Sequence, residues 1–397
     1  MLRNRSSAPP KYPLSDLALW ALTLVLAIVA AKRIIVQSRE LAVGTSYAAA
    51  FDLHLRYVEA HRWLAGLPLY GLTQTDYPPA TYAFLGPLIG HLDWPAVRIL
   101  WLVLCLASLG ALSVIAWRAV ETRRAARSLA AVLPWAAYGS ALTLGVGQLG
   151  LICLATGLGG VLLARRAGRS VAGATSAGLL FTVSLVKPTL TAPWFWLLVL
   201  ASPIAGGLTV VLYGAATLAA CAAQPEPLPR LLTGWIDNGH LHTARGYGSV
   251  AGWASALGFR SLIVPLGLAM LVGLGLWVLR HRRADIWILL GVAAFVSRFF
   301  TYHYYVDDLL LLVPMIALLR LACVEGDQPD IVRRVAAGAF LLAVLAQLTP
   351  TRWFTELGPA VGRATEGFQI VVWLVVASVL VWAAMPYNFG NKGGFTQ

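Results

Sequence analysis

Apolar runs of membrane-spanning length recur along this sequence, and they constrain its fold more than any other feature. A helix that crosses a bilayer needs about 20 apolar residues. Hydrophobic residues make up 59% of the 397 and charged residues 12%, against about 25% charged in soluble domains. The mean hydropathy is +0.73. A soluble domain could not hide so much apolar surface, so the sequence predicts a single integral membrane domain over residues 1–397.

Twelve segments are predicted to span the membrane, which gives an all-α, multi-pass bundle. Those near 149–164, 189–203 and 285–300 are short for a span. The run "PPATYAFLGPLIG" (78–90) is shorter still and is broken by Pro and Gly, so we expect an interfacial or re-entrant helix there. The predicted spans are 16–36, 96–118, 126–144, 149–164, 170–186, 189–203, 204–222, 261–279, 285–300, 307–322, 332–348 and 367–385.

Positive charges fix the expected orientation, because cytoplasmic loops are rich in Lys and Arg. With twelve spans and residues 1–15 in the cytoplasm, four basic clusters face the cytoplasm, whereas counting 78–90 as a span would turn them outward. We therefore expect a protein of the cytoplasmic (inner) membrane with both termini inside and a flexible tail at 386–397. The basic clusters are 122–127, 165–169, 280–283 and 333–334.

The net charge of +13 has the same explanation. Basic residues in short loops orient the chain and meet anionic headgroups, so the lipid bilayer is an expected partner and nucleic acid is not. The four cysteines fall within or at the ends of apolar runs without paired spacing. They predict neither a disulfide framework nor a metal site.

Ionisable residues mostly avoid the middles of the predicted spans. A transporter usually places such groups mid-span, but here they gather in the first outer loop (37–95) and at the outward ends of later spans. This suits a site at the membrane surface, where one substrate arrives from lipid and the other from water. It predicts an enzyme acting on a lipid-linked molecule. A transporter or flippase and a non-catalytic envelope protein are the alternatives.

The densest charge lies in "AAAFDLHLRYVEAHRWLAGLPLYG" (48–71). There Asp52, Arg56 and Glu59 occupy positions i, i+4 and i+7, on one face of a helix. One interpretation is a solvated interfacial helix with an Asp52–Arg56 ion pair. The other is a carboxylate held at the mouth of a cavity as a general base.

Three further motifs mark polar helix junctions on the same side. In "TDYPPATY" (75–82) two prolines open a helix, which is a structural role. In "GVGQLG" the glycines let the backbone approach closely, and Gln148 supplies an amide. In "SLVKPTLT" Lys187 either snorkels to the headgroups or, beside the helix break at Pro188, holds a phosphate.

The second concentration of polar side chains is "SRFFTYHYYVDDLLLL" (297–312). Its tyrosines, Tyr302 among them, are expected in an interfacial aromatic belt. That belt does not account for Arg298 and His303, which could bind an anionic leaving group. Asp307 or its acidic neighbour could orient them.

Taken in order, these motifs resemble the polyprenol-phosphate-sugar-dependent transferases of glycosyltransferase family 87. The order is an aspartate and "LAGLPLYG" after the first span, then "YPP", "GQ" and "KP", and finally His and Tyr before a late span. The family has the GT-C fold and includes mannosyltransferases and an arabinofuranosyltransferase. The resemblance covers roughly the whole chain and implies a GT-C-type bundle of about twelve spans with interfacial helices in the first outer loop.

The resemblance also implies a mechanism. Asp52 matches the catalytic aspartate of the superfamily, which deprotonates an acceptor hydroxyl for inverting attack on a polyprenyl-phosphate sugar. Lys187 and His303 match the "KP" and late-histidine positions and would neutralise charge on the leaving phosphate. Arg298 stands where the family often has proline after serine, so it is only a candidate phosphate contact.

The substrates implied are a polyprenyl-phosphate sugar, with mannose expected and arabinofuranose or glucose as alternatives, and a hydroxyl of an envelope glycolipid or polysaccharide. No metal or other cofactor is expected, because the leaving group is a monophosphate and cationic side chains are present. The residues expected to orient the base or contact substrate are Arg56, Glu59, His54, His61, Tyr77, Gln148, Tyr302 and Asp307.

Overall fold

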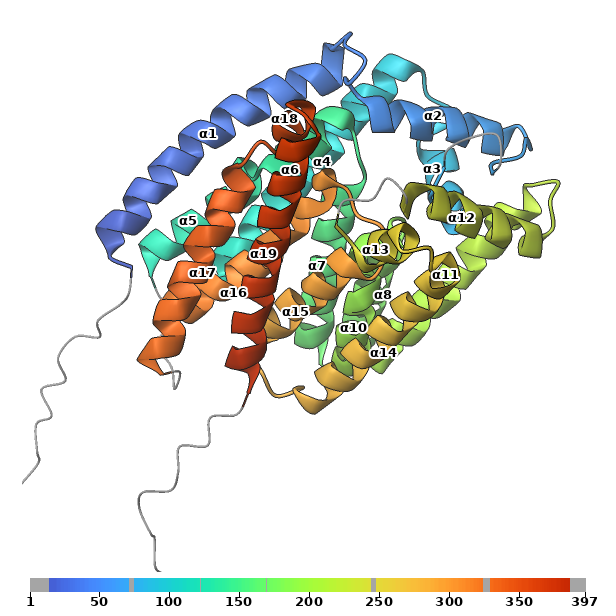
Figure 1. Ribbon diagram of the computed structural model, residues 1–397. Helices are drawn as coiled ribbons and strands as arrows, with labels where there is room; N and C mark the ends of the chain where they lie inside the picture. The colour runs from blue at the N-terminus through green and yellow to red at the C-terminus, as the bar shows by residue number, and fades with distance from the viewer. Residues whose placement is uncertain are drawn as a thin grey trace, which may run out of the picture.

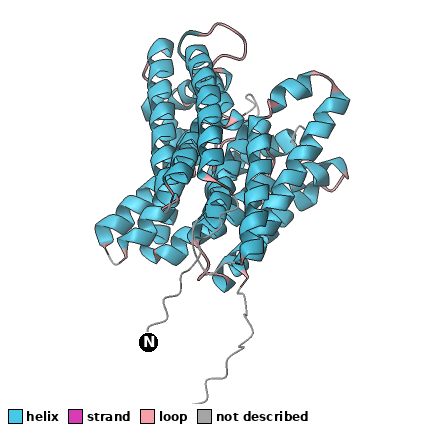
Figure 2. Cartoon of the chain, turned by 90° about the vertical axis from the view of Figure 1, so that its left-hand side faces the viewer, coloured by secondary structure: helices cyan, strands magenta, loops and turns pink. Residues whose placement is uncertain are grey.

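Every regular element that the structure describes is a helix, which confirms the expected all-α architecture (Figures 1 and 2). The structure is a computed structural model. It describes residues 14–70, 75–121, 123–168, 170–243, 248–323 and 329–385. The predicted tail at 386–397 and most of the N-terminal segment 1–15 lie outside the described residues.

Eight helices are long and apolar enough to cross a membrane. Several of them present large apolar side chains at their surface, such as Val211 and Leu276, each 66% exposed. Apolar faces of this length suit lipid rather than water, as expected of a multi-pass membrane protein. The eight are α1 (Asp16–Val43), α4 (Trp94–Ala119), α5 with α6 (Arg124–Val146), α7 (Gly150–Ala167), α11 (Pro203–Ala222), η2 with α14 (Arg260–Arg280), α17 (Asp330–Leu348) and α19 (Pro359–Ala384).

The other four predicted spans form shorter or divided helices. Pro188 and Pro193 fall at the start of separate helical pieces, because proline cannot donate to the i→i−4 ladder. A polar turn at Tyr304 likewise separates a 3₁₀ helix from the helix before it. The elements are α8 (Val171–Ser184), α9 (Pro188–Thr191), η1 (Ala192–Trp194), α10 (Phe195–Ala201), α15 (Ile286–Phe299), η3 (Tyr305–Leu311) and α16 (Leu312–Cys323).

The predicted span 126–144 is interrupted at Ala137, where α5 (Arg124–Ala136) gives way to α6 (Tyr138–Val146). Arg33 of α1 covers this break. Its guanidinium donates to the carbonyl of Ala136 at 2.5 Å and to that of Leu348, at the end of α17, at 2.8 Å. A break within an apolar run is tolerated where a side chain satisfies the freed backbone groups.

The first span is longer than predicted, since α1 continues past residue 36 to Val43. Arg98 of α4 holds its end, with Nε donating to the carbonyl of Leu41 at 2.5 Å and Nη2 to that of Gly44 at 2.9 Å. A cation at a helix C-terminus is favoured by the helix dipole and by unpaired carbonyls. This contact sets where the first outer loop begins.

Four helices that lie outside the predicted spans gather toward one end of the bundle. In Figure 1, α2 (Phe51–Leu64), α3 (Pro79–Ile89), α12 (Leu228–Thr243) and α18 (Thr351–Glu356) lie in the upper part, whereas the described chain begins and ends in the lower part. The run 78–90 forms the short helix α3, as predicted, and it packs against α2 and α11. The one described helix not yet named is α13 (Val250–Ala256).

Candidate active site

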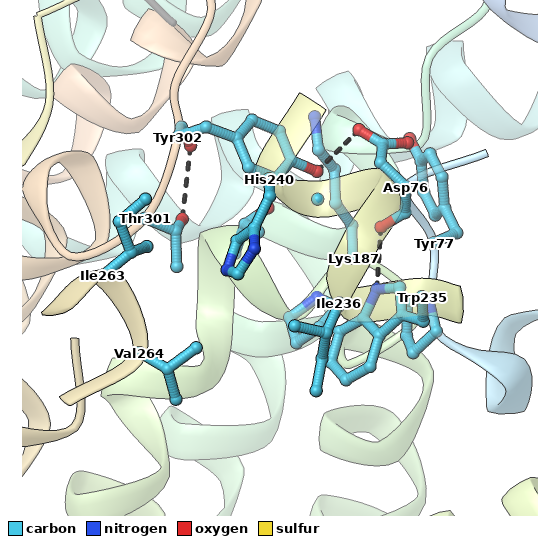
Figure 3. Close-up of a pocket in the computed structure, with 14 residues that line it drawn as sticks. Asp76, Tyr77, Lys187, Trp235, Ile236, His240, Ile263, Val264, Thr301 and Tyr302 are labelled. Carbon is cyan, nitrogen blue, oxygen red and sulfur yellow. Dashed lines mark hydrogen bonds between the residues drawn. The ribbon is translucent and has the colours of Figure 1, made fainter. Parts of the chain in front are cut away.

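Two cavities lie beside α12 and share one wall. The polar cavity, of about 520 Å³, is lined by Asp52, Arg56, Gln148, His242, Tyr304 and Arg352, among others. The apolar cavity, of about 160 Å³, is lined by Pro78, Trp235, Ile236, His240, Ile263 and Val264, among others (Figure 3). The shared wall consists of the four residues that line both: Asp76, Tyr77, Lys187 and Tyr302.

Asp52 lies in the first turn of α2, half-buried, and faces the polar cavity. Its carboxylate makes no hydrogen bond or ion pair within the described part of the chain. The expected pair with Arg56 is not formed. Burial raises the pKa of Asp52, and the charges of Arg56 and Lys187 offset only part of that rise. A cavity-facing carboxylate with a raised pKa can accept a proton from a substrate.

The glycine-rich junction at 145–150 positions α2. Gly147 has a φ of 71°, and a Cβ added there would come within 2.6 Å of Leu53 Cβ. Only glycine takes this backbone conformation without cost and leaves that space. The N–H of Ala50 also donates to the carbonyl of Gly145 at 3.0 Å. These contacts bring the start of α2, and hence Asp52, against the turn that carries Gln148.

Arg56 and Glu59 belong to a buried chain of charges behind the polar cavity. Arg56 Nε lies 3.0 Å from Glu59 Oε2, and Tyr82 Oη donates to the same oxygen at 2.8 Å. Arg56 also lies over the ring of Tyr77, 4.3 Å from its centroid. Glu59 lines neither cavity, so in this structure it holds Arg56 in place.

The segment 75–77 is fixed through three consecutive carbonyl groups. Thr75 O accepts from Asn238 Nδ2 at 2.8 Å, Asp76 O from Trp235 Nε1 at 2.9 Å, and Tyr77 O from Tyr70 Oη at 2.8 Å. Two of these donors come from α12, so the helix and the segment hold each other. The backbone that carries Asp76 is thus firmly positioned at the shared wall.

The carboxylate of Asp76 has partners of its own, unlike that of Asp52. Tyr302 Oη donates to Asp76 Oδ2 at 2.6 Å, and Arg56 Nη1 lies 3.5 Å from Oδ1. Burial alone would raise the pKa of Asp76, but its surroundings, with Arg56 foremost and the hydrogen bond from Tyr302 among them, together outweigh burial and lower it. Asp76 was not predicted as a site residue. Its only sequence signal was its place beside "YPP" in the first outer loop.

Lys187 is buried at the shared wall, where it forms an ion pair with Asp307 of η3. Asp307 Oδ2 in turn accepts from the N–H of Tyr304 at 3.4 Å. A snorkelling lysine would extend its ammonium into solvent or headgroups, whereas this side chain is only 6% exposed. The burial therefore favours the site interpretation of Lys187.

Arg298 and His303 are brought together, but they line neither cavity. Arg298 is fully buried, with Nε 3.3 Å from Asp308 Oδ1, and it donates to the carbonyl of Gly248 at 3.0 Å. His303 Nε2 lies 3.1 Å from the same Asp308 oxygen. Burial lowers the pKa of His303, and the charge of Arg298 lowers it further. Their contact with a phosphate stays a prediction, and in this structure they support the chain around η3.

The remaining predicted residues divide between the cavity and the surface. Gln148 is 6% exposed and faces the polar cavity, and its Oε1 has no partner within the described residues. His54 is exposed and packs edge-on against Trp94, and His61 is exposed and packs edge-on against Tyr57. Neither histidine lines a cavity.

The polar cavity also contains residues that were not predicted. His242 of α12, whose Nδ1 lies 2.9 Å from Tyr304 Oη, and Arg352 of α18 line it together with Asp52. Both come from helices far along the chain, and no motif in the sequence connects them to the first outer loop. Only the folded arrangement places them at the same cavity.

Comparison of the chain with protein-family models, with curated proteins and with solved structures finds no match. Within the described residues, no group of three or more His, Cys, Asp or Glu side chains gathers to hold a metal ion. The chemistry of the site therefore rests on its own geometry. An unpartnered carboxylate can activate a hydroxyl, and a buried ammonium nearby can stabilise an anionic leaving group.

Proposed function

We propose that this protein is an inverting membrane glycosyltransferase of the GT-C type. It moves a sugar, mannose in the first instance, from a polyprenyl-phosphate donor to a hydroxyl of an envelope glycolipid or polysaccharide. The observation that carries the proposal is the pair of cavities, one apolar and one polar, that meet at a wall holding Lys187. A lipid-linked donor and a polar acceptor need such a pair.

The apolar cavity suits the lipid end of the donor. Ile236 is 39% exposed and Val264 45% exposed, so the cavity reaches the apolar surface between α12 and α14. Figure 3 shows Ile263 and Val264 across this cavity from Asp76 and Tyr77. A polyprenyl chain lying there would bring its phosphate to Lys187, where a buried ammonium interacts strongly because little water screens it.

The polar cavity suits the acceptor. Asp52 accepts the proton of an acceptor hydroxyl while that oxygen attacks the anomeric carbon, on the face opposite the phosphate. The bond from the anomeric carbon to the phosphate oxygen breaks, and its electron pair leaves on polyprenyl phosphate beside Lys187. The products are an inverted glycoside, a protonated Asp52 and the lipid phosphate. The raised pKa of Asp52 makes it a better base than an ordinary aspartate.

The proposed topology keeps the twelve predicted spans, with the four short or divided elements crossing beside the eight long helices. Both termini lie in the cytoplasm, and the site faces the outer side of the cytoplasmic membrane. The gathering of α2, α3, α12 and α18 at the end away from the first and last described residues supports this arrangement (Figure 1).

The test is transfer by the purified full-length protein from a panel of polyprenyl-phosphate sugars to a pool of envelope glycolipids. Wild type is compared with Asp52→Asn, which keeps the size of the side chain and removes the base. The matched control is Asp237→Asn, because Asp237 is exposed on α12 and lines neither cavity. We expect wild type and the control to use one donor and Asp52→Asn to be inactive.

Two outcomes would contradict the proposal. Near-normal turnover by a well-folded Asp52→Asn protein would dismiss Asp52 as the base. Movement of a lipid-linked sugar across proteoliposomes by wild type, with no transfer to any acceptor, would favour the flippase alternative.

A further inference from the structure

Asp76 is the one acidic side chain on the shared wall, and it has no role in the proposed mechanism. It faces both cavities, and its side chain is 14% exposed. Figure 3 shows its carboxylate close to Tyr302, at the end of the apolar cavity that Lys187 also reaches. Asp76 and Lys187 thus place opposite charges on the wall between the apolar and the polar cavity, and the proposed mechanism explains only the lysine.

The carboxylate of Asp76 has acceptor capacity to spare. An ionised carboxylate offers about four acceptor positions. The protein occupies one through Tyr302 Oη at 2.6 Å and approaches a second through Arg56 at 3.5 Å. Three carbonyl contacts fix the backbone of residues 75–77, so a carboxylate with unused acceptor positions is held at the wall that lines both cavities.

Charge decides which part of a sugar phosphate can lie there. A phosphate is repelled by Asp76 and attracted by Lys187, so it takes the lysine side of the wall. The sugar comes next toward the polar cavity, and its hydroxyls are hydrogen-bond donors. Resting on the proposed function, we infer that Asp76 binds a hydroxyl group of the donor sugar and thereby selects which sugar the protein uses.

This role differs from that of Asp52. Asp52 lines only the polar cavity and has no partner within the described residues, which leaves its carboxylate open to a substrate proton. Asp76 is bound to Tyr302 and Arg56 and stays ionised, because its pKa is lowered. An ionised, positioned acceptor makes strong hydrogen bonds to hydroxyls. It also repels a sugar that carries its own carboxylate, which excludes uronic acids.

The test is donor binding in a protein that cannot turn over. Dissociation constants are measured for Asp52→Asn and for Asp52→Asn/Asp76→Asn. The probes are polyprenyl-phosphate mannose, glucose and arabinofuranose, the monodeoxy analogues of the tightest binder, and bare polyprenyl phosphate. We expect one deoxy analogue to bind about 10-fold or more weaker to Asp52→Asn, as for loss of a charge-assisted hydrogen bond. In the double variant, removal of the same sugar hydroxyl should weaken binding little, because the interaction with Asp76 is already lost.

The controls separate this inference from the proposed function. Bare polyprenyl phosphate should bind both proteins about equally. Asp237→Asn in the Asp52→Asn background changes an exposed carboxylate of α12 that lines neither cavity, so it should keep the deoxy discrimination. Sugar donors that bind with the same deoxy pattern in both proteins would overturn the inference and leave the proposed function intact. Failure of every polyprenyl-phosphate compound to bind would contradict the proposed function first.

A second measurement applies if the Asp76 variant does not fold. Wild type is titrated with polyprenyl-phosphate mannose and with the corresponding mannuronic acid donor. We expect the anionic sugar to bind at least about 10-fold more weakly, since its carboxylate would lie against Asp76. Equal binding of the two donors would rule out a carboxylate in the sugar subsite.

Discussion

Two aspartates of the first outer loop show how neighbours assign different properties to the same side chain. Asp52 faces a cavity without a partner and has a raised pKa, whereas Asp76 is bound by Tyr302 and Arg56 and has a lowered pKa. Pairs of carboxylates whose pKa values are driven apart are typical of sites that divide acid–base chemistry from binding. The local sequence around each residue does not reveal this difference.

Replacing Lys187 tests both its own role and its effect on Asp52. Loss of a donor that stabilises developing negative charge costs about 2–4 kcal/mol, so Lys187→Ala should lower kcat by at least tenfold. The charge of Lys187 also lowers the pKa of Asp52. In the proposed mechanism activity requires ionised Asp52, so it should rise with pH through that pKa. Without Lys187 the pKa is higher, and the acid limb of kcat/KM should move to higher pH.

Two further variants show whether the effect of Lys187→Ala comes from the lost ammonium itself. Lys187→Ala/Asp307→Asn removes both charges of the buried pair, so it tests whether an unpaired carboxylate causes the loss. Arg282→Ala, exposed in the loop between α14 and α15, should leave rate and pH profile unchanged. A rate loss below tenfold with an unmoved acid limb would make Lys187 a structural residue.

The sequence predicted which residues would be candidates for a site better than it predicted the ion pairs that those residues form. Asp52, Lys187 and Gln148 were predicted from charge or helix breaks and all line the polar cavity. The Asp52–Arg56 pair was wrong, because Arg56 is closer to Glu59, three residues further along the same helix. Spacing places both carboxylates within reach of Arg56, and only tertiary packing decides between them.

At the scale of helices, arginines join elements that the sequence keeps far apart. Arg33 binds the carbonyls that end α5 and α17, and Arg98 binds those that end α1. In an apolar environment an unsatisfied carbonyl is costly. These cations therefore let helices end or break inside the bundle without leaving polar groups exposed to lipid.

Arg33 should contribute measurably to stability. Arg33→Ala leaves the carbonyls of Ala136 and Leu348 without this donor, so we expect the free energy of unfolding to fall by about 1–3 kcal/mol. The neighbouring Lys32 is exposed, and Lys32→Ala should change the free energy of unfolding by less than about 0.5 kcal/mol. Denaturant unfolding in detergent measures both. Equal stability of the two variants would contradict the role assigned to Arg33.

Most helices could be predicted from the sequence, because apolar length is the signal and it is local. The short helix α3 was predicted for the same reason, since Pro and Gly bound its apolar run. The interruption between α5 and α6 was not predicted. The run 126–144 is mostly apolar, and although Pro134 lies three residues before the break, the group that satisfies the freed carbonyl there, Arg33, lies on another helix.

At the scale of the whole molecule, the site elements lie at the end of the bundle away from the first and last described residues (Figure 1). The shared wall lies among α3, α9, α12 and the turn before η3, at the end where α2 and α18 also lie. A donor can thus approach from lipid while an acceptor approaches from water on the same side. The proposed topology puts this end outside the cytoplasm.

Cysteine labelling tests that topology. Asp237 on α12 and Arg282 between α14 and α15 are both exposed. We expect a membrane-impermeant maleimide to label Asp237→Cys in intact cells and Arg282→Cys only after permeabilisation. Cys221, the one native cysteine that is not buried, is replaced by alanine in both proteins. Labelling of Arg282→Cys in intact cells would invert the topology and move the proposed site to the cytoplasm.

The contacts of Arg33 have a consequence for biosynthesis. Its two well-placed partners follow it by 103 and 315 residues. At about 5–20 residues per second, a ribosome reaches the second partner about 15–60 s after making Arg33. The first helix therefore waits in the membrane with an incompletely bonded cation until α17 is inserted. During this interval α1 depends on a helix not yet made for its full set of hydrogen bonds, so insertion of α17 should stabilise the first helix of the chain.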